Sequence, residues 1–469
     1  FMTSKSKNKH FEVPHTFIII FIIILFSVFL TWIIPGGKYT KIMTEQGIKV
    51  IDPNKFEYIK NSPVNPVKIP LYIVQAFCKN IDLLLVILFS GGSFHMITKS
   101  GALQSVIAKV ANKFSERLGI FIPILTLVFG LICTSQAVNI FIAFAPVMVM
   151  MALALGLDSI CGAAIILLGG AIGFATGTLN VSTTIISQKI AELPLYSGIG
   201  YRTFCFIIYF IVTNIFLIRY ANKIKKNPKL SPMYDLDSQN ELKALSNLEE
   251  FGEMNTRKWM IIVVLIIALI TIVSGSIFLG WDLQEQSAIF LTLGIIVGII
   301  SGFNGNTICK EFLNGCKGML GAAFIIGLAR SIGNIMNDAN IIDTVVHSLA
   351  NVLNYIPFYL QGTGMLIVNT IINIFITSGS GQASVVMPIM IPLADLVGMT
   401  RQSAILAFNF RDGFCNYILP TSTALMGIIS AVNIPYDRWM KFMWKCFFLW
   451  MIIGAFLIFI AQLIKLGPM

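Results

Sequence analysis

Charged side chains are scarce in this sequence. Asp, Glu, Lys and Arg make up only 12% of its 469 residues, whereas 56% are apolar. Soluble domains carry about 25% charged and about 45–50% apolar residues, so this composition excludes an ordinary cytosolic enzyme. The 37 glycines and 17 prolines follow no period, which also excludes a collagen-like or disordered chain. The chain is expected to form one polytopic membrane body.

Thiol and metal chemistry have no pattern here either. The eight cysteines form no CxxC pair, and the four histidines show no ligand spacing such as HExxH. We therefore expect no disulfide framework, no metal site and no cofactor. The sequence also lacks paired carboxylates and a nucleophile–base motif, so an enzyme is not predicted. The first apolar run is followed by Pro-Gly-Gly rather than a small-residue cleavage site, which argues against a cleavable signal peptide.

Long apolar runs are what the sequence has in abundance. A transmembrane helix needs about 20 apolar residues to cross about 30 Å of hydrocarbon. Two long regions, 120–195 and 356–431, exceed one span but are broken by Gly, Pro, Ser, Thr and Asn. Seven further segments approach or reach the length of one span: 17–34, 82–97, 202–219, 258–279, 287–303, 318–334 and 438–464.

The placement of Lys and Arg predicts the orientation. Four lysines between 223 and 229 follow a span directly, so the polar segment 220–257 is predicted to be a cytoplasmic linker. The N-terminal tail, 1–16, is predicted to be cytoplasmic by the same rule. The net charge of +11 then indicates topology in a membrane and not a nucleic-acid partner. The loop 35–69 disagrees, because it carries six lysines and is predicted to lie outside.

The two halves of the chain resemble each other in sequence. Residues 101–112 align with 340–351, and 173–183 align in part with 413–423. This similarity predicts two repeats, 17–219 and 287–469, and the extra span 258–279 inverts the second copy. Each repeat is expected to hold a re-entrant hairpin and a broken helix. These are about 118–157 and about 159–190 in the first repeat, and about 356–397 and about 402–431 in the second.

The four breaks carry the candidate site. In hydrocarbon, irregular backbone survives only where protein buries it or a water-filled cavity meets it. Opposed hairpins with discontinuous helices are typical of secondary transporters, whose solute binds near the midplane. The alternative is that small residues only let the helices pack closely. The candidate binding residues are the short polar side chains at the breaks: Ser135, Gln136, Asn139, Thr178, Asn180, Thr377, Ser378, Ser380, Gln382, Asn416, Thr421 and Ser422.

Two charged residues interrupt the second broken helix. Asp412 and Arg411 stand in an apolar span, where ionisable groups commonly mark a pathway or a substrate contact. The aligned positions of the first repeat, Ala171 and Ile172, are apolar, so the charge breaks the symmetry. We predict that Asp412 contacts the solute and that Arg411 and Arg330 are charge partners. The alternative is a structural salt bridge to another span.

The assembled motifs resemble a known family. Residues 173–180, 193–202, 379–384 and 387–398 are similar to the YfcC-type carriers, a branch of the anaerobic C4-dicarboxylate carrier family that includes arginine/ornithine exchangers. The resemblance extends over nearly the whole chain. It implies an all-α fold of the ion transporter superfamily, with an inverted repeat, two re-entrant hairpins and an elevator-like movement. It also implies a homodimer in the bacterial inner membrane. Arg411 departs from the family, whose members commonly have Gly before the aspartate.

The leading hypothesis is an exchanger of a small carboxylate-bearing solute, such as arginine against ornithine. The helix ends would hold the α-carboxylate, and Asp412 would receive the cationic end or couple a proton. Na⁺ or H⁺ is the candidate coupling ion. The alternative is a C4-dicarboxylate carrier in which Arg411 meets the second carboxylate. A channel is less favoured, because broken helices favour an occluded site.

Overall fold

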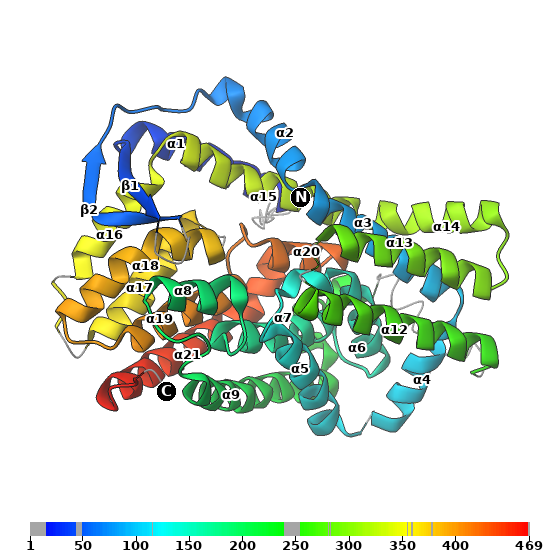
Figure 1. Ribbon diagram of the computed structural model, residues 1–469. Helices are drawn as coiled ribbons and strands as arrows, with labels where there is room; N and C mark the ends of the chain where they lie inside the picture. Colours follow the sequence, from blue (N-terminus) through cyan, green and yellow to red (C-terminus); the bar gives the residue numbers. More distant parts are fainter. Residues whose placement is uncertain are drawn as a thin grey trace, which may run out of the picture.

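The computed structural model describes residues 16–43, 49–114, 116–238, 254–279, 281, 283–353, 355–357, 360–376 and 379–467. Most of the predicted N-terminal tail and part of the linker 220–257 lie outside these ranges. The described chain is almost entirely helical, as predicted, with one small sheet (Figure 1). Six of the described helices are long and apolar enough to cross a membrane: Ile81–Lys99, Ser159–Thr176, Ile199–Lys226, Leu283–Ile300, Leu320–Asp338 and Tyr436–Leu463.

The first half of the chain contains long helices joined by short helical segments, and one small sheet. Its elements are α1 (Thr16–Ile33), β1 (Gly37–Met43), β2 (Lys49–Tyr58), η1 (Pro66–Lys68), α2 (Ile69–Lys79), α3 (Ile81–Lys99), α4 (Ala102–Phe114), α5 (Leu118–Cys133), η2 (Val138–Phe144), α6 (Ala145–Ala154), α7 (Ser159–Thr176), η3 (Val181–Ile185), α8 (Ile186–Ile190), α9 (Ile199–Lys226), η4 (Pro228–Leu230) and α10 (Tyr234–Asp237). Helix α9 continues to Lys226, past the predicted start of the linker at residue 220.

The described elements of the second half are all helices. They are α12 (Thr256–Phe278), α13 (Leu283–Ile300), α14 (Gly305–Gly318), α15 (Leu320–Asp338), α16 (Ile342–Leu353), α17 (Gln361–Phe375), α18 (Gly379–Leu396), α19 (Arg401–Cys415), α20 (Thr423–Ala431) and α21 (Tyr436–Leu463). Each of the seven segments predicted as spans overlaps one long helix.

The lysine-rich segment 35–69 is not the plain loop that the sequence predicts. It contains the antiparallel hairpin β1–β2, in which Gly37 pairs with Tyr58. Tyr39 of β1 is buried. Its backbone N–H donates to Asp343 Oδ2 of α16 at 3.0 Å, and its hydroxyl lies 2.8 Å from His347 Nδ1. Side chains alternate across a strand, so the exposed face of β1 can carry lysines while the other face docks on α16. The predicted all-α class is therefore incomplete, because it lacks the hairpin β1–β2.

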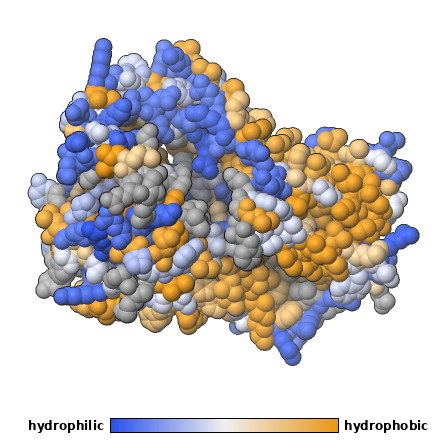
Figure 2. Space-filling view, in the orientation of Figure 1, coloured by the Kyte–Doolittle hydropathy of each residue, from blue (hydrophilic) through white to orange (hydrophobic). Residues whose placement is uncertain are grey.

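The polar ends of the molecule lie far apart. The hairpin and α16 lie at one end, whereas α4 and the start of α12 lie at the other (Figure 1). Hydrophilic residues gather over the hairpin end, and hydrophobic residues cover α12 and α13 between the two ends (Figure 2). A broad apolar surface bounded by polar ends is the surface expected of a protein embedded in a bilayer.

Two helices form the centre of the core. In α7, 94% of the span is buried inside the protein, and every residue of α19 from Gln402 to Cys415 is buried. The two helices cross where Gly413 meets Ala175, so closely that a side chain at Gly413 would overlap Ala175. Glycine is needed at this crossing because the backbones approach within the space of a methyl group. The crossing places the ends of both helices near the middle of the bundle.

Candidate functional site

The segments predicted as hairpins, about 118–157 and about 356–397, contact the ends of the two central helices. At the tip of the first hairpin, the carbonyl of Thr134 accepts a hydrogen bond from the N–H of Leu179, just beyond α7, at 3.1 Å. From the same hairpin, Asn139 accepts a bond from the hydroxyl of Thr423, at the start of α20, at 3.4 Å. The first tip therefore contacts the breaks of both halves.

The second hairpin reaches α19 through Arg411. The Nη1 of Arg411 donates to Asn373 Oδ1 of α17 at 2.7 Å and to Gln382 Oε1 of α18. The guanidinium also lies 4.4 Å from the centre of the Phe408 ring. Arg411 is fully buried, and a buried charge is stable only when it is paired and hydrogen-bonded. One guanidinium thus links both arms of the second hairpin to the central helix.

Asp412 supplies the compensating charge. Its Oδ1 lies 3.3 Å from Arg411 Nη1 and accepts a bond from Asn416 Nδ2, also at 3.3 Å. Its other oxygen, Oδ2, has no hydrogen-bond partner among the described residues. A Cβ at Gly379, the first residue of α18, would stand 2.7 Å from this oxygen and 2.7 Å from Thr183 Cγ2. The free carboxylate oxygen therefore faces the start of α18 and the broken end of the first half.

The break after α7 is tied to α19. Gly177 ends α7 in the left-handed conformation, with φ of +59°, which glycine adopts without strain. Its carbonyl accepts a bond from Thr184 Oγ1 at 2.7 Å. Thr184 Oγ1 in turn accepts a bond from Asn409 Nδ2 of α19, also at 2.7 Å. Asn180 caps the following turn by accepting from the N–H of Thr183 at 3.1 Å.

Several buried polar atoms of this region lack hydrogen-bond partners in the described part of the chain. Most buried polar groups in proteins are hydrogen-bonded, and each unpaired one is costly. A polar solute with both donors and acceptors would satisfy such atoms. They are Thr178 Oγ1, Asn180 Nδ2, Thr183 Oγ1, both amide atoms of Asn369, Gln382 Nε2, Asn409 Oδ1, Arg411 Nε and Nη2, Asp412 Oδ2 and Thr421 Oγ1.

Some of the predicted residues lie together in one cluster, and others lie outside it. Gln382, Asn416, Arg411 and Asp412 form one hydrogen-bonded cluster. Thr178 and Asn180 lie at the first break, whose Thr183 is next to the same cluster. Thr421 is 6% exposed at the second break.

Other predicted residues serve the helices that carry them. Ser422 caps α20 by accepting from the N–H of Leu425 at 3.4 Å, and Ser135 donates to the carbonyl of Ile132 in its own hairpin at 3.1 Å. Gln136 is half-buried at the same tip. Arg330 is half-buried on α15, and its Nε has no partner among the residues described.

Three predicted residues have no described side-chain position. Thr377 and Ser378, predicted at the second tip, lie outside the described residues. Ser380 falls in the first turn of α18. Their role in binding stays a prediction.

Sequence reasoning missed four residues of the cluster. Asn369 and Asn373 are buried on α17, and Asn409 and Thr184 join α19 to the first break. The amides of α17 are four residues apart, which places them on one face of a helix. Amides repeated at that spacing inside an apolar segment are a signal available in the sequence. The prediction took only the polar side chains at the breaks and therefore missed them.

The described residues hold no group of three or more His, Cys, Asp or Glu side chains that could bind a metal ion. The cluster itself offers hydrogen-bond donors and acceptors and one buried ion pair. Such a set can bind and orient a charged solute, and it contains no nucleophile paired with a base.

Comparison with known proteins decides the family. Residues 13–463 match the family of C4-dicarboxylate anaerobic carriers. The chain belongs to this family. As a C4-dicarboxylate anaerobic carrier family member, it is a membrane transporter that acts on small molecules. The resemblance inferred from the motifs at 173–202 and 379–398 is confirmed.

Relatives of this family member extend over almost its full length. It is 29% identical to the "Putative basic amino acid antiporter YfcC" of Escherichia coli K12, over 94% of both chains. It is also 26% identical to an uncharacterized protein of Haemophilus influenzae Rd, over 97% of this chain and 98% of that one.

Solved transporters are more distant. The YdaH transporter of Alcanivorax borkumensis aligns with 97% of this chain and 100% of its own, at 14% identity and a TM-score of 0.43. MtrF of Neisseria gonorrhoeae, described with a class of antimetabolite efflux pumps, aligns with 97% of this chain and 96% of its own, at 16% identity and a TM-score of 0.43.

Proposed function

We propose that the protein is a secondary active exchanger of a small zwitterionic solute, with a basic amino acid such as arginine exchanged against ornithine. The observation that supports this most is the buried Arg411–Asp412 pair. Among the described residues, two donor nitrogens of Arg411 and one acceptor oxygen of Asp412 have no hydrogen-bond partner. A solute with one carboxylate and at least one cationic group matches both.

The Arg411 side chain suits a carboxylate. Its Nη1 is occupied by Asn373 and Gln382, whereas Nε and Nη2 have no partner among the described residues. These two nitrogens form one edge of the guanidinium, and that edge matches the two oxygens of a carboxylate. The same carboxylate would complete the hydrogen bonding of a buried cation.

The Asp412 carboxylate suits the other end of the solute. Its Oδ2 can accept from an ammonium or guanidinium group, while Oδ1 stays bound to Arg411 and Asn416. The bound solute would then lie between α18, α19 and the break after α7. Opposite charges on neighbouring residues fix the direction in which a zwitterion binds.

A C4-dicarboxylate is the second candidate. The free edge of Arg411 supports it, because that edge can meet a carboxylate of either solute class. The family description points to the same class. In this case Asp412 would bind a coupling proton or Na⁺ and would not contact a cationic group of the solute.

Exchange across a membrane requires that the buried site open to each side in turn. Arg411 is 0% and Asp412 is 1% exposed, so a solute can reach them only after the hairpins move. An inverted repeat supplies two related halves for this movement. The positions of α4 and α16 at opposite ends of the molecule support such an inversion (Figure 1). The elevator movement and the homodimer stay predictions from the family resemblance.

We place the start of α12, α4 and the start of α21 on the cytoplasmic side of a bacterial inner membrane. Lys109 of α4 lies 5.6 Å from the Trp259 ring of α12, which brings two basic segments together. Arg438 of α21 pairs with Asp235 of the linker at 3.2 Å. Clustered Lys and Arg at one set of helix ends favour the cytoplasm under the positive-inside rule.

Counterflow in proteoliposomes tests the proposed function. Vesicles loaded with ornithine should accumulate labelled arginine, and vesicles loaded with succinate should not. Empty vesicles are the matched control for binding to lipid. Succinate counterflow without arginine counterflow would replace the exchanger of basic amino acids by the dicarboxylate carrier. Single-channel currents in a planar bilayer would contradict both.

A further inference from the structure

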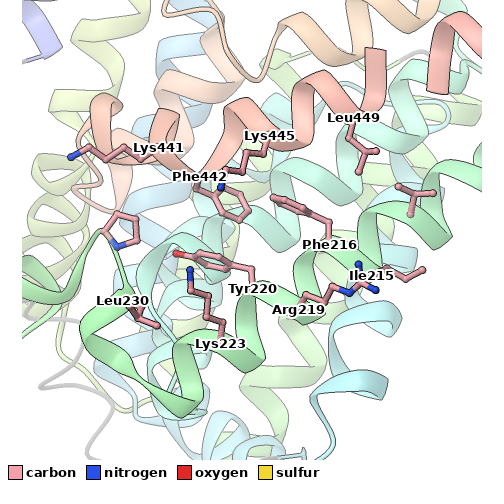
Figure 3. A pocket seen from close by; sticks show the side chains of 12 residues that line it. Ile215, Phe216, Arg219, Tyr220, Lys223, Leu230, Lys441, Phe442, Lys445 and Leu449 are labelled. Atoms are coloured by element: carbon pink, nitrogen blue, oxygen red, sulfur yellow. The ribbon is translucent and has the colours of Figure 1, made fainter. Parts of the chain in front are cut away.

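A second feature that can bind a ligand lies between α9 and α21, and none of the residues that line it belongs to the Arg411–Asp412 cluster. A pocket of about 580 Å³ opens between the C-terminal part of α9 and the N-terminal part of α21 (Figure 3). This volume lies within the range of about 300–1,000 Å³ that is usual for small-molecule sites. Four cationic side chains line it: Arg219, Lys223, Lys441 and Lys445.

The pocket walls change from apolar to cationic along the helices. On α9, Val212 and Ile215 precede Arg219 and Lys223 on the same side, about 16 Å from first to last at 1.5 Å per residue. On α21 the order is reversed, because the two helices run antiparallel and Leu449 follows the lysines. The cations therefore gather at one end of the pocket and the apolar side chains at the other.

Three aromatic rings form the floor of the pocket. The rings of Tyr220 and Phe442 pack at 4.6 Å, and Phe216 packs on Phe442 at 5.4 Å. The hydroxyl of Tyr220 donates to the buried carboxylate of Asp158 at 2.6 Å, which fixes the ring. Figure 3 shows these rings between the two helices, with the cationic side chains around them. The bond from Tyr220 to Asp158 and the ring contacts thus hold the floor in place.

Few carboxylates of the described residues lie near these cations. Within the described residues, no carboxylate oxygen lies within 4.0 Å of Arg219, Lys223 or Lys445. Lys441 lies 4.0 Å from Asp437, which also lies 3.8 Å from Arg438. All four cations are exposed. An anion at this end of the pocket would meet a strongly positive potential.

We propose that the pocket binds an anionic phospholipid, with its phosphate among the four cations and an acyl chain along Val212, Ile215 and Leu449. Basic pockets between membrane helices on the cytoplasmic side bind anionic headgroups. The apolar wall favours a lipid over a soluble phosphate, because a soluble anion leaves that wall unused. The lipid site is independent of the solute, since no residue of the pocket belongs to the Arg411–Asp412 cluster.

Native mass spectrometry of the detergent-purified full chain tests this site. The probe is phosphatidylglycerol, and phosphatidylcholine and inorganic phosphate are the comparison ligands. The test variant is Lys223→Gln/Lys445→Gln. The matched control is Lys226→Gln/Lys229→Gln, which removes the same charge from exposed residues at the same end of α9 that do not line the pocket. Loss of two cations should weaken phosphatidylglycerol binding by about 30-fold, and the control should stay near wild type.

A third variant tests the apolar wall. Ile215→Asn, at a side chain 46% exposed, should weaken phosphatidylglycerol binding and leave the protein folded. Equal losses in the test and control pairs would overturn the proposal in favour of general surface charge. Displacement of the lipid by millimolar inorganic phosphate would make the pocket a plain anion site, and equal binding of phosphatidylcholine would also contradict it. Arginine counterflow plays no part in these readouts, so the lipid site and the proposed exchange fail separately.

Discussion

The central helices α7 and α19 are alike in shape and different in chemistry. Each ends at a break near the middle of the bundle, and each has a glycine at a close crossing, Gly173 against the carbonyl of Gly130 and Gly413 against Ala175. Just before these glycines, α7 has Ala171 and Ile172, whereas α19 has a buried ion pair. Glycine therefore meets the packing requirement in both halves. The charge serves a task that only the second half performs, which we propose is to bind the two ends of the solute.

The largest effect is expected from removing the charge of Asp412. In Asp412→Asn, the remaining carbonyl oxygen can still accept from Arg411, so the protein should elute as a single folded species. Exchange should fall by about 100-fold or more, because a buried charged partner of the solute is lost. Counterflow rates in proteoliposomes measure this.

The control for this change is Asp395→Asn. Asp395 forms an exposed ion pair with Arg401, and such pairs contribute little, so exchange should stay within about two-fold of wild type. Wild-type exchange in Asp412→Asn would show that the charge of α19 is structural, as the alternative of a plain salt bridge requires.

A charge added to the neutral helix α7 should destabilise the folded protein. Ile172→Asp puts a carboxylate at a fully buried position of α7, which should cost about 3–5 kcal/mol of stability. A lower thermal unfolding temperature in detergent measures this, with Ile172→Val as the control for the loss of volume. Unchanged stability would mean that α7 has access to water or to a counter-charge, and the contrast between the helices would fail.

An intermediate effect is expected at the start of α18. In Gly379→Ala, the new methyl group would stand 2.7 Å from Asp412 Oδ2, so the carboxylate or the hairpin must shift, at a cost of about 1–3 kcal/mol. Exchange should fall by about ten-fold. Gly119→Ala is the matched control, because Gly119 lies in the first turn of α5 with nothing within 4 Å. Equal effects of the two changes would remove Gly379 from the site.

The smallest effect is expected where the two helices are joined. Asn409 donates to Thr184 at 2.7 Å, and a double-mutant cycle of Asn409→Leu and Thr184→Val should give a coupling of about 0.5–1 kcal/mol in unfolding free energy. Additive changes would show that the break after α7 is not held by α19. Thr126 with Asn214, a buried pair at 2.8 Å between α5 and α9, provides a reference cycle away from the site.

The sequence predicts the helices better than it predicts the site. Apolar length alone identified the long helices, and the two charged residues inside an apolar span, Arg411 and Asp412, identified the part of α19 that carries the cluster. The hairpin β1–β2 was missed because six lysines suggest a loop, whereas Tyr39 anchors the strand through Asp343 and His347, about 300 residues away. Contacts at such separation leave no local pattern.

Asn373, one partner of Arg411, was missed for a related reason, whereas Gln382, another partner, was among the predicted residues. Asn373 lies within an apolar helix, where a single amide is as consistent with helix packing as with binding. Only the folded chain brings its Oδ1 within 2.7 Å of Arg411 Nη1. Ser422, in contrast, was predicted to bind the solute and is used as a helix cap. Short polar residues at a break serve both purposes, and local sequence does not separate them.

Equilibrium binding by titration calorimetry tests the central claim most directly. The protein in detergent is titrated with arginine, with the amine that remains when arginine loses its carboxylate, and with succinate. The proposed site requires both ends of the solute, so arginine should bind at least about ten-fold more tightly than either of the others, and Asp412→Asn should abolish its binding. Arginine binding that survives Asp412→Asn, or succinate binding as tight as that of arginine, would contradict the account.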